Sequence, residues 1–201
     1  MICPCRFPGC PLYLVKVFEN SSSDPDRRRK TTLPMTSRTA IVAYFDTTLE
    51  RAFKTPMLSD VTRVHSGWGP MPRVTHCTDD AGWGQPGGSR KVFAAPTVGF
   101  KGGEAALDVV LERRENEYWE IEVRDLQYQM LGFERFQGEW ITTPQPDGRI
   151  RIDYRYAMIS KVAWLYPLQW VFTKTVWRLY MKHVLENIRE MVREEAAYLH
   201  G

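Results

Sequence analysis

The stretch that decides the fold is residues 149–158, which read Arg-Ile-Arg-Ile-Asp-Tyr-Arg-Tyr-Ala-Met. Large apolar side chains occupy every second position, at Ile150, Ile152, Tyr154, Tyr156 and Met158. The intervening positions include Arg149, Arg151, Asp153 and Arg155. Successive side chains of a strand point to opposite faces, so this alternation predicts a strand with one dry face and one wet face. Such strands are typical of antiparallel sheets.

The same pattern recurs upstream of this strand. In residues 117–124 the apolar positions Trp119, Ile121 and Val123 alternate with charged residues. Residues 104–113 also alternate, and here the inner face is assigned to Ala105, Leu107, Val109 and Leu111. Residues 133–142 place Phe136, Gly138 and Trp140 together on one face. Further strands are predicted at 38–45, 73–78 and 89–95, with turns between them.

Helices are predicted near both ends of this series of strands. Asp46 is expected to be the N-cap of a short helix over 47–54 that Pro56 ends, and a second short helix covers 58–64. Residues 168–199 carry a helical stripe of Trp170, Trp177, Met181, Val184, Ile188 and Met191. A helix of about 30 residues is about 45 Å long, and its stripe must be buried. The dry face of the sheet is the available partner, which predicts an α+β fold.

Length and charge limit the possible functions. The 201 residues and 23.4 kDa suit one domain with a tail, and the 43% apolar content excludes a disordered chain. Residues 1–36 hold six basic and three acidic side chains, whereas the remaining 165 residues hold 21 of each. Because nucleic acid binding needs clustered positive charge, it is excluded for the body. We expect a flexible appendage over 1–36 and a single domain over 37–201, with Met35 an alternative start.

The motifs for metal and cofactor binding are absent or misplaced. Cys3, Cys5, Cys10 and Cys77 lack paired metal-ligand spacing, and the four histidines are scattered, so neither a metal nor a cofactor is expected. This sparse cysteine usage favours a cytoplasmic protein. Gly82, Gly84 and Gly87 fit G-x-G-x-x-G, but a strand is predicted after them instead of a helix. They therefore indicate a turn and not a dinucleotide site.

No stretch of about 20 apolar residues exists, so stable membrane insertion is not expected. The aromatic segment Trp164–Trp170 lies between Lys161 and Lys174, which leaves contact with a membrane surface open. The sequence also leaves a homodimer open.

The order of elements, together with specific residues, resembles the SRPBCC superfamily over residues 37–199. The residues that carry the resemblance are Asp46 with its short helix, the loop Gly67–Pro72, the turn Gly82–Arg90, the segment Gly138-Glu139-Trp140 and the stretch Asp147–Tyr154. The chain is most similar to uncharacterised bacterial members grouped with polyketide cyclases and lipid-transport domains. The resemblance implies a helix-grip fold, in which a curved antiparallel sheet of six or seven strands wraps around a long C-terminal helix. It also implies a hydrophobic cavity, but not one activity.

The inward aromatic residues are the main candidates for ligand contact. We expect a lipid or polyketide-like molecule to lie against a set of large side chains on the dry faces: Trp119, Ile121, Phe136, Trp140, Ile152, Tyr154, Tyr156, Trp177 and Met181. The alternative is a cyclase or dehydratase with a buried acid or base. Its candidate groups are Glu139, Asp108 and His76, although both acids fall on the wet register of their strands. A third interpretation is a core filled by side chains, with no internal void.

Overall fold

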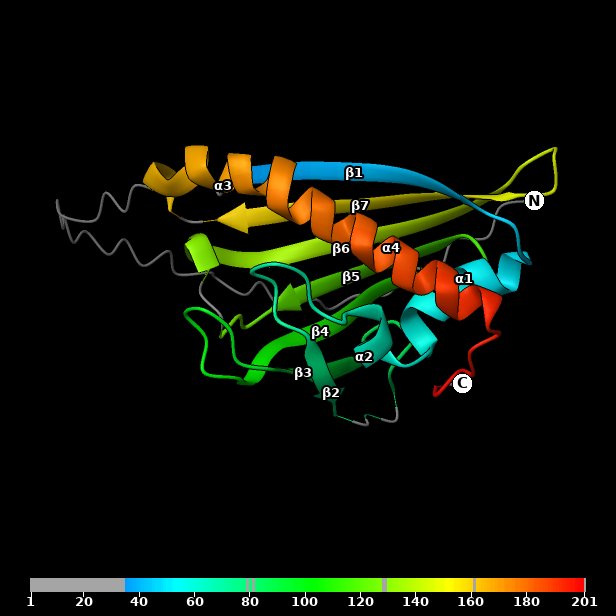
Figure 1. The fold of residues 1–201 in the computed structure, drawn as a ribbon, viewed down its shortest axis with the longest axis horizontal. Helices are drawn as coiled ribbons and strands as arrows, with labels where there is room; N and C mark the ends of the chain where they lie inside the picture. The colour runs from blue at the N-terminus through cyan, green and yellow to red at the C-terminus, as the bar shows by residue number, and fades with distance from the viewer. Residues whose placement is uncertain (1–34, 79, 81, 128–129, 161, 201) are drawn as a thin grey trace, which may run out of the picture. The chain divides into compact units, whose positions relative to one another are not determined.

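A computed structural model describes residues 35–200 of the chain, except 79, 81, 128, 129 and 161. The helix-grip fold predicted above is confirmed. Seven antiparallel strands form one sheet in the order β1-β7-β6-β5-β4-β3-β2, and the C-terminal helical segment runs across it (Figure 1). The predictions for residues 1–34 lie outside the described residues.

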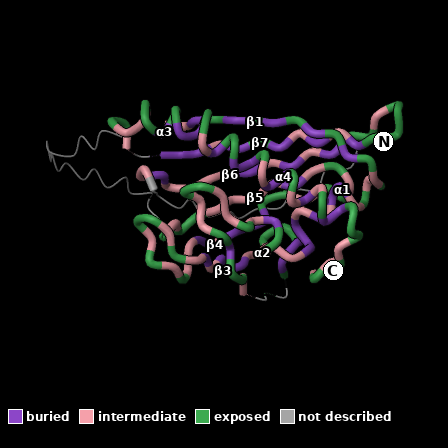
Figure 2. The backbone as a smooth tube through the Cα atoms, in the orientation of Figure 1, coloured by how far each residue is buried: buried purple, intermediate pink, exposed green. Residues whose placement is uncertain are grey.

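The sheet agrees closely with the alternation in the sequence. Its strands are β1 (Met35–Phe45), β2 (Val74–Cys77), β3 (Ser89–Ala94), β4 (Gly103–Arg114), β5 (Tyr118–Arg124), β6 (Phe133–Pro144) and β7 (Ile150–Ser160). Strand β7 lies between β1 and β6, with Tyr154 opposite Ile41 of β1 on one side and Trp140 of β6 on the other. Buried residues alternate along β1 and along most of β7, and Figure 2 shows much of both strands as buried.

The predicted inner face of β4 is wrong in part. Ala106, Asp108 and Val110 are buried and Leu111 is exposed, against the prediction, whereas Val109 is buried as predicted. A register shift between Val110 and Glu112 leaves Leu111 unpaired in the ladder with β5. Both faces of β4 carry apolar residues, so alternation alone could not decide between them. Asp108 can lie inside because Arg90 is directly opposite it on β3.

Helix α1 (Leu49–Leu58) also differs from its prediction. Its N-cap is Thr48 and not Asp46, because the Thr48 hydroxyl accepts the backbone N–H of Arg51 at 3.2 Å. Pro56 lies inside the helix instead of ending it. The second helix, α2 (Val61–Val64), is shorter than predicted and begins after its N-cap Asp60.

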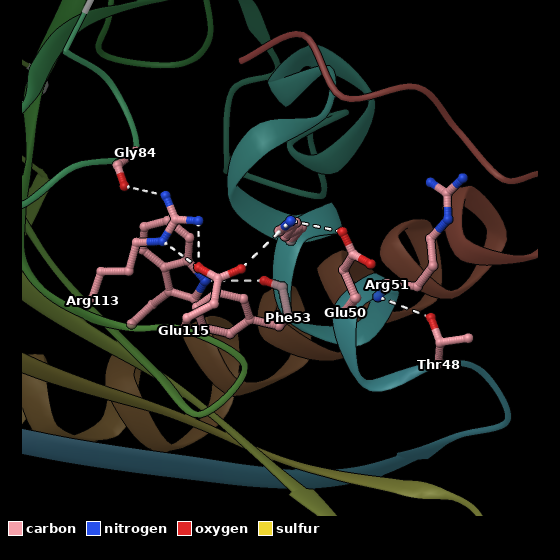
Figure 3. A network of polar contacts seen from close by, with 9 residues as sticks. Thr48, Glu50, Arg51, Phe53, Gly84, Arg113 and Glu115 are labelled. Carbon is pink, nitrogen blue, oxygen red and sulfur yellow. Dashed lines mark hydrogen bonds and ion pairs between the residues drawn. The ribbon is translucent and has the colours of Figure 1, made fainter. Parts of the chain in front are cut away.

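Polar contacts connect α1 to the sheet (Figure 3). Arg113 of β4 donates to the carbonyl oxygen of Gly84 at 2.8 Å and pairs with Glu115 at 2.6 Å. Glu115 lies 3.5 Å from Lys54 of α1, whose ammonium also bonds Glu50 at 2.7 Å. The Arg113 guanidinium also lies over the Trp119 ring, 4.7 Å from its centroid. These contacts hold α1 over the end of the sheet where β4 turns into β5.

The C-terminal helical segment is interrupted by a π turn. It consists of η2 (Ala163–Leu165), α3 (Tyr166–Phe172), the π-helical η3 (Thr173–Trp177) and α4 (Arg178–Arg193). A π turn holds more residues than an α turn, so it shifts the phase of the buried stripe. Trp177, Met181, Val184, Ile188 and Met191 are buried as predicted, but Trp170 is exposed and Gln169 is buried in its place.

The helix ends at Arg193 and not near Leu199. Glu195 adopts a left-handed conformation, and the Ala196 backbone N–H donates to the Met191 carbonyl at 2.9 Å. The last residues then return to α1, where the Leu199 N–H donates to the Leu58 carbonyl at 2.7 Å.

Candidate functional site

A cavity of about 140 Å³ lies between the inner face of the sheet and the C-terminal helical segment. Its walls are mostly apolar and come from strands β2 to β7, helix α2, η3, α4 and the loop before β2. Small side chains at Ala94, Ala105 and Ala106 leave room on the sheet side. The cavity is partly open to solvent and is not an enclosed internal void, so the interpretation of a core filled entirely by side chains stays a prediction.

Gly138 shapes the cavity from strand β6. A Cβ atom at this position would come within 2.9 Å of Cζ of Tyr156. Without it, the Tyr156 ring packs closely against Gly138 and forms part of the cavity wall. Burial raises the pKa of Tyr156 to about 12, so the phenol is neutral and can donate a hydrogen bond at neutral pH.

Asp108 provides a carboxylate at the cavity wall. It is 8% exposed and pairs with Arg90, whose Nε lies 3.5 Å from its Oδ2. The Arg90 guanidinium is itself stacked over the Trp83 ring at 3.6 Å from the centroid. Burial raises the pKa of Asp108, and the charge of Arg90 opposes this rise. The cavity therefore contains one group with both acid–base and hydrogen-bonding capacity.

His65 and Tyr180 form a second polar contact at the cavity. His65 Nδ1 and the Tyr180 hydroxyl are 2.8 Å apart and join the end of α2 to α4. Burial, together with the smaller effect of the Arg90 charge, lowers the pKa of His65 to about 4. The imidazole is therefore neutral near pH 7 and can accept or donate according to its tautomer.

The indole N–H of Trp177 has no hydrogen-bond partner among the described residues. Trp177 is 6% exposed, and its side chain lines the cavity from the π turn. A buried N–H without a partner costs free energy, and π turns occur frequently at functional sites. A bound molecule with an acceptor atom would satisfy this donor.

The structure distributes the predicted ligand-contact residues over three places. Ile121, Phe136, Tyr156 and Trp177 line the 140 Å³ cavity. Trp119, Trp140 and Tyr154 line a neighbouring volume of about 40 Å³, which also shares Ile121, Tyr156 and His65. Ile152 and Met181 are fully buried core residues. The larger cavity is therefore centred further toward β3 and β4 than the sequence predicts.

The structure places the three predicted acid–base candidates in different surroundings. Asp108 faces the cavity, contrary to its expected wet register. Glu139 lies on the outer face of β6, half-buried, and pairs with Arg155 at 3.6 Å. His76 is exposed on β2 and stacks on Phe93, with ring centroids 4.4 Å apart. Only Asp108 combines burial with access to the cavity.

Sequence reasoning missed His65 and Tyr180. His65 follows a four-residue helix and belongs to no motif. Tyr180 lies three residues after Trp177 and one before Met181, so its place on the buried stripe was a usable signal. The described residues contain no cluster of three metal-ligating side chains. None of the helices in this part of the chain is both long and apolar enough to cross a membrane.

No protein-family model matches the chain, and no curated protein matches it. Several solved structures match the chain in their fold. A protein of unknown function from Staphylococcus aureus superposes with a TM-score of 0.61 at 9% identity, covering 81% of this chain and 97% of that one. Ara h 8.0201 gives 0.56 at 14% identity, covering 80% of this chain and 99% of its own.

Norcoclaurine synthase from Thalictrum flavum is a further structural neighbour. Its TM-score is 0.53 at 11% identity, and the match covers 82% of this chain and 90% of the synthase. Identities this low establish a shared fold and no more. The neighbours confirm the helix-grip fold that the SRPBCC resemblance predicts.

Proposed function

We propose that this helix-grip protein binds a small hydrophobic molecule in the cavity between its sheet and C-terminal helical segment. The observation that carries the proposal is the cavity itself, which has mostly apolar walls, is partly open to solvent and contains few polar groups. Burial of apolar surface would drive uptake at about 25 cal/mol per Å². The polar groups would orient the ligand, as in most small-molecule sites.

The size of the cavity favours a ligand with one ring. A volume of 140 Å³ is close to that of an engineered cavity of about 150 Å³ that binds benzene. Drug-sized ligands occupy about 300–1,000 Å³. A long lipid or a multi-ring polyketide would therefore extend beyond this volume, through the open side of the cavity.

The polar groups favour a ligand that both donates and accepts hydrogen bonds. The Asp108 carboxylate can accept one bond, and the Trp177 indole N–H can donate one. A phenol satisfies both with a single hydroxyl group or with two substituents. The norcoclaurine synthase structure contains dopamine and hydroxybenzaldehyde, which are one-ring molecules with hydroxyl groups. This supports the proposed ligand class by analogy of fold.

A catalytic function of the cyclase or dehydratase type is the second candidate. The observation that favours it is Asp108, because a buried carboxyl with a raised pKa suits general acid or base chemistry. The neutral His65–Tyr180 pair provides a second group that can move a proton.

Native mass spectrometry of the purified protein, with identification of released molecules, tests the proposal first. Titration with phenol, benzene and palmitate follows. We expect phenol to bind more tightly than benzene, and palmitate to bind weakly. Ala106→Leu fills the cavity and should abolish phenol binding, whereas Ala157→Leu on the outer face of β7 should not. A protein that takes up none of these probes and carries no adduct would contradict the proposal.

The Asp108→Asn variant separates binding from catalysis. A binding protein should release the same molecule from the wild type and the variant, with weaker binding in the variant. An enzyme should accumulate a different, unconverted molecule in the variant.

A further inference from the structure

The helical segment presents apolar side chains to solvent on the side that faces away from the sheet. Trp164 is 80% exposed, and Leu168, Val171, Leu179 and Trp170 are each about half exposed. Trp164, Leu168, Val171 and Leu179 are separated by four, three and eight residues, and the π turn accounts for the longest interval. They therefore form one stripe along the helix. We call this stripe, together with Trp170, the outer helical face.

Three basic residues lie on the same helical segment as the outer helical face. Lys174, Arg178 and Lys182 are all exposed. Residues 163–185 contain no Asp or Glu. None of the three cations forms an ion pair with another described residue; the Lys174 ammonium donates only to the backbone carbonyl of Arg38. Elsewhere most exposed basic side chains pair with acids, for example Arg193 with Glu190 on α4.

We infer that the outer helical face docks onto an anionic lipid surface. Exposed tryptophan and leucine side chains on a helix insert at the boundary between headgroups and acyl chains, and neighbouring lysine and arginine attract anionic headgroups. A second copy of this chain fits the charges less well, because two such faces would bring only positive side chains together. The inference does not depend on the ligand-binding proposal.

A second apolar element lies at the same end of the sheet as α3. The strand registers place Ala94 opposite Gly103, and Phe133 opposite Ser160, so the β3–β4 loop and the start of α3 share one end (Figure 1). Val98 at the tip of this loop is 90% exposed. Docking through α3 would therefore bring this loop and the adjacent cavity wall close to the lipid surface.

Sedimentation with vesicles tests the inference on the full chain. Vesicles of phosphatidylserine and phosphatidylcholine are compared with vesicles of phosphatidylcholine alone. We expect the protein to bind the anionic vesicles more tightly. The preference should weaken in 1 M salt, where the Debye length falls to about 3 Å.

Charge variants locate the site of contact. The triple variant Lys174→Gln/Arg178→Gln/Lys182→Gln should weaken binding to anionic vesicles about hundredfold, from about fivefold for each basic residue. Lys91→Gln/Arg114→Gln/Arg193→Gln removes the same net charge elsewhere and should bind like the wild type. The basic run 27–30 is present in all of these proteins, so the difference reports on the outer helical face.

Apolar variants test insertion. Trp164→Ser/Leu168→Ser should lower the partition coefficient about tenfold or more. The control Val42→Ser/Tyr44→Ser removes exposed apolar side chains from the outer face of β1 and should have little effect. The inference would be overturned if the wild type, the triple variant Lys174→Gln/Arg178→Gln/Lys182→Gln and the variant Trp164→Ser/Leu168→Ser all bound the vesicles equally. A dimer in solution that Leu179→Ser dissociates while vesicle binding stays unchanged would also overturn it.

Discussion

The indole Nε1 of Trp140 donates to the carbonyl oxygen of Ala52 at 3.1 Å. In a regular helix that carbonyl would accept the N–H of the residue four positions later, which here is Pro56 and has none. The sheet therefore supplies the donor that the helix lacks. Trp119 and Trp83 extend this arrangement by donating to the carbonyls of Phe53 and Met57, at 3.0 and 2.8 Å. This explains why Pro56 is tolerated within α1.

Trp140→Phe should lower the free energy of unfolding by about 2–4 kcal/mol, because it removes the donor to a buried carbonyl and leaves a small void. Pro56→Ala restores a backbone N–H that can reach Ala52. In the Pro56→Ala background, Trp140→Phe should therefore cost about 1–2 kcal/mol less. Urea unfolding of the four proteins measures the coupling. An equal cost in both backgrounds would show that the carbonyl does not depend on the indole.

Gly138→Ala should disturb the cavity wall. The new Cβ would lie 2.9 Å from Cζ and 3.1 Å from Cε1 of Tyr156, so the ring must move. Overpacking of this kind costs about 1–3 kcal/mol. We also expect weaker phenol binding, measured by calorimetry. Tyr156→Leu in the same chain should recover part of the lost stability. Wild-type stability and phenol binding in Gly138→Ala would refute the assigned role of Gly138.

Removing one partner of the Arg90–Asp108 pair should lower the free energy of unfolding more than removing both partners. Asp108→Asn leaves a buried guanidinium without its counter-ion, and breaking a buried pair in this way costs about 3–5 kcal/mol. Stacking of Arg90 on Trp83 places the expected cost near the lower end of this range. The double variant Arg90→Met/Asp108→Leu removes both charges and should be more stable than Asp108→Asn. Chemical denaturation compares them, and a less stable double variant would count against a buried pair.

His65 should make stability depend on pH. Its pKa is about 4 in the folded protein and about 6.5 in the unfolded chain. Between these values the unfolded chain binds more protons, so the free energy of unfolding decreases as the pH falls from about 6.5 to about 4. The loss from this group should reach about 2–3 kcal/mol. Unfolding curves of the wild type and His65→Gln, taken across this range, isolate it.

A second buried group, Asp108, changes the free energy of unfolding with pH in the opposite direction. Its raised pKa in the folded protein favours folding at low pH and opposes it once the pH rises above the unfolded value. Because Asp108 is present in both proteins, its contribution cancels in the difference. A difference between the wild type and His65→Gln that stays constant with pH would contradict the lowered pKa of His65.

The sequence by itself determined the strands and their antiparallel pairing. The alternation in 149–158 and 117–124 is unambiguous because most of the apolar residues have polar neighbours on both sides, and one face must be buried. The long C-terminal helix also followed from its stripe. The inward positions of Trp119, Trp140, Tyr154 and Tyr156 were predictable for the same reason, and all four are buried.

Local signals failed where a distant residue supplied the missing partner. Pro56 ends a helix in isolation, but Trp140 compensates for its missing N–H. Trp170 fits a regular helical stripe, but the π turn before Arg178 shifts the phase.

The tertiary structure alone decided the polar chemistry of the cavity. Asp108 can face inward because Arg90 lies across the ladder on β3, and His65 is held neutral because burial between α2 and α4 lowers its pKa. Burial and electrostatic pairing depend on residues that are far apart in the chain, whereas alternation depends on neighbours. The elements could therefore be read from the order of residues, but the site required their positions in space.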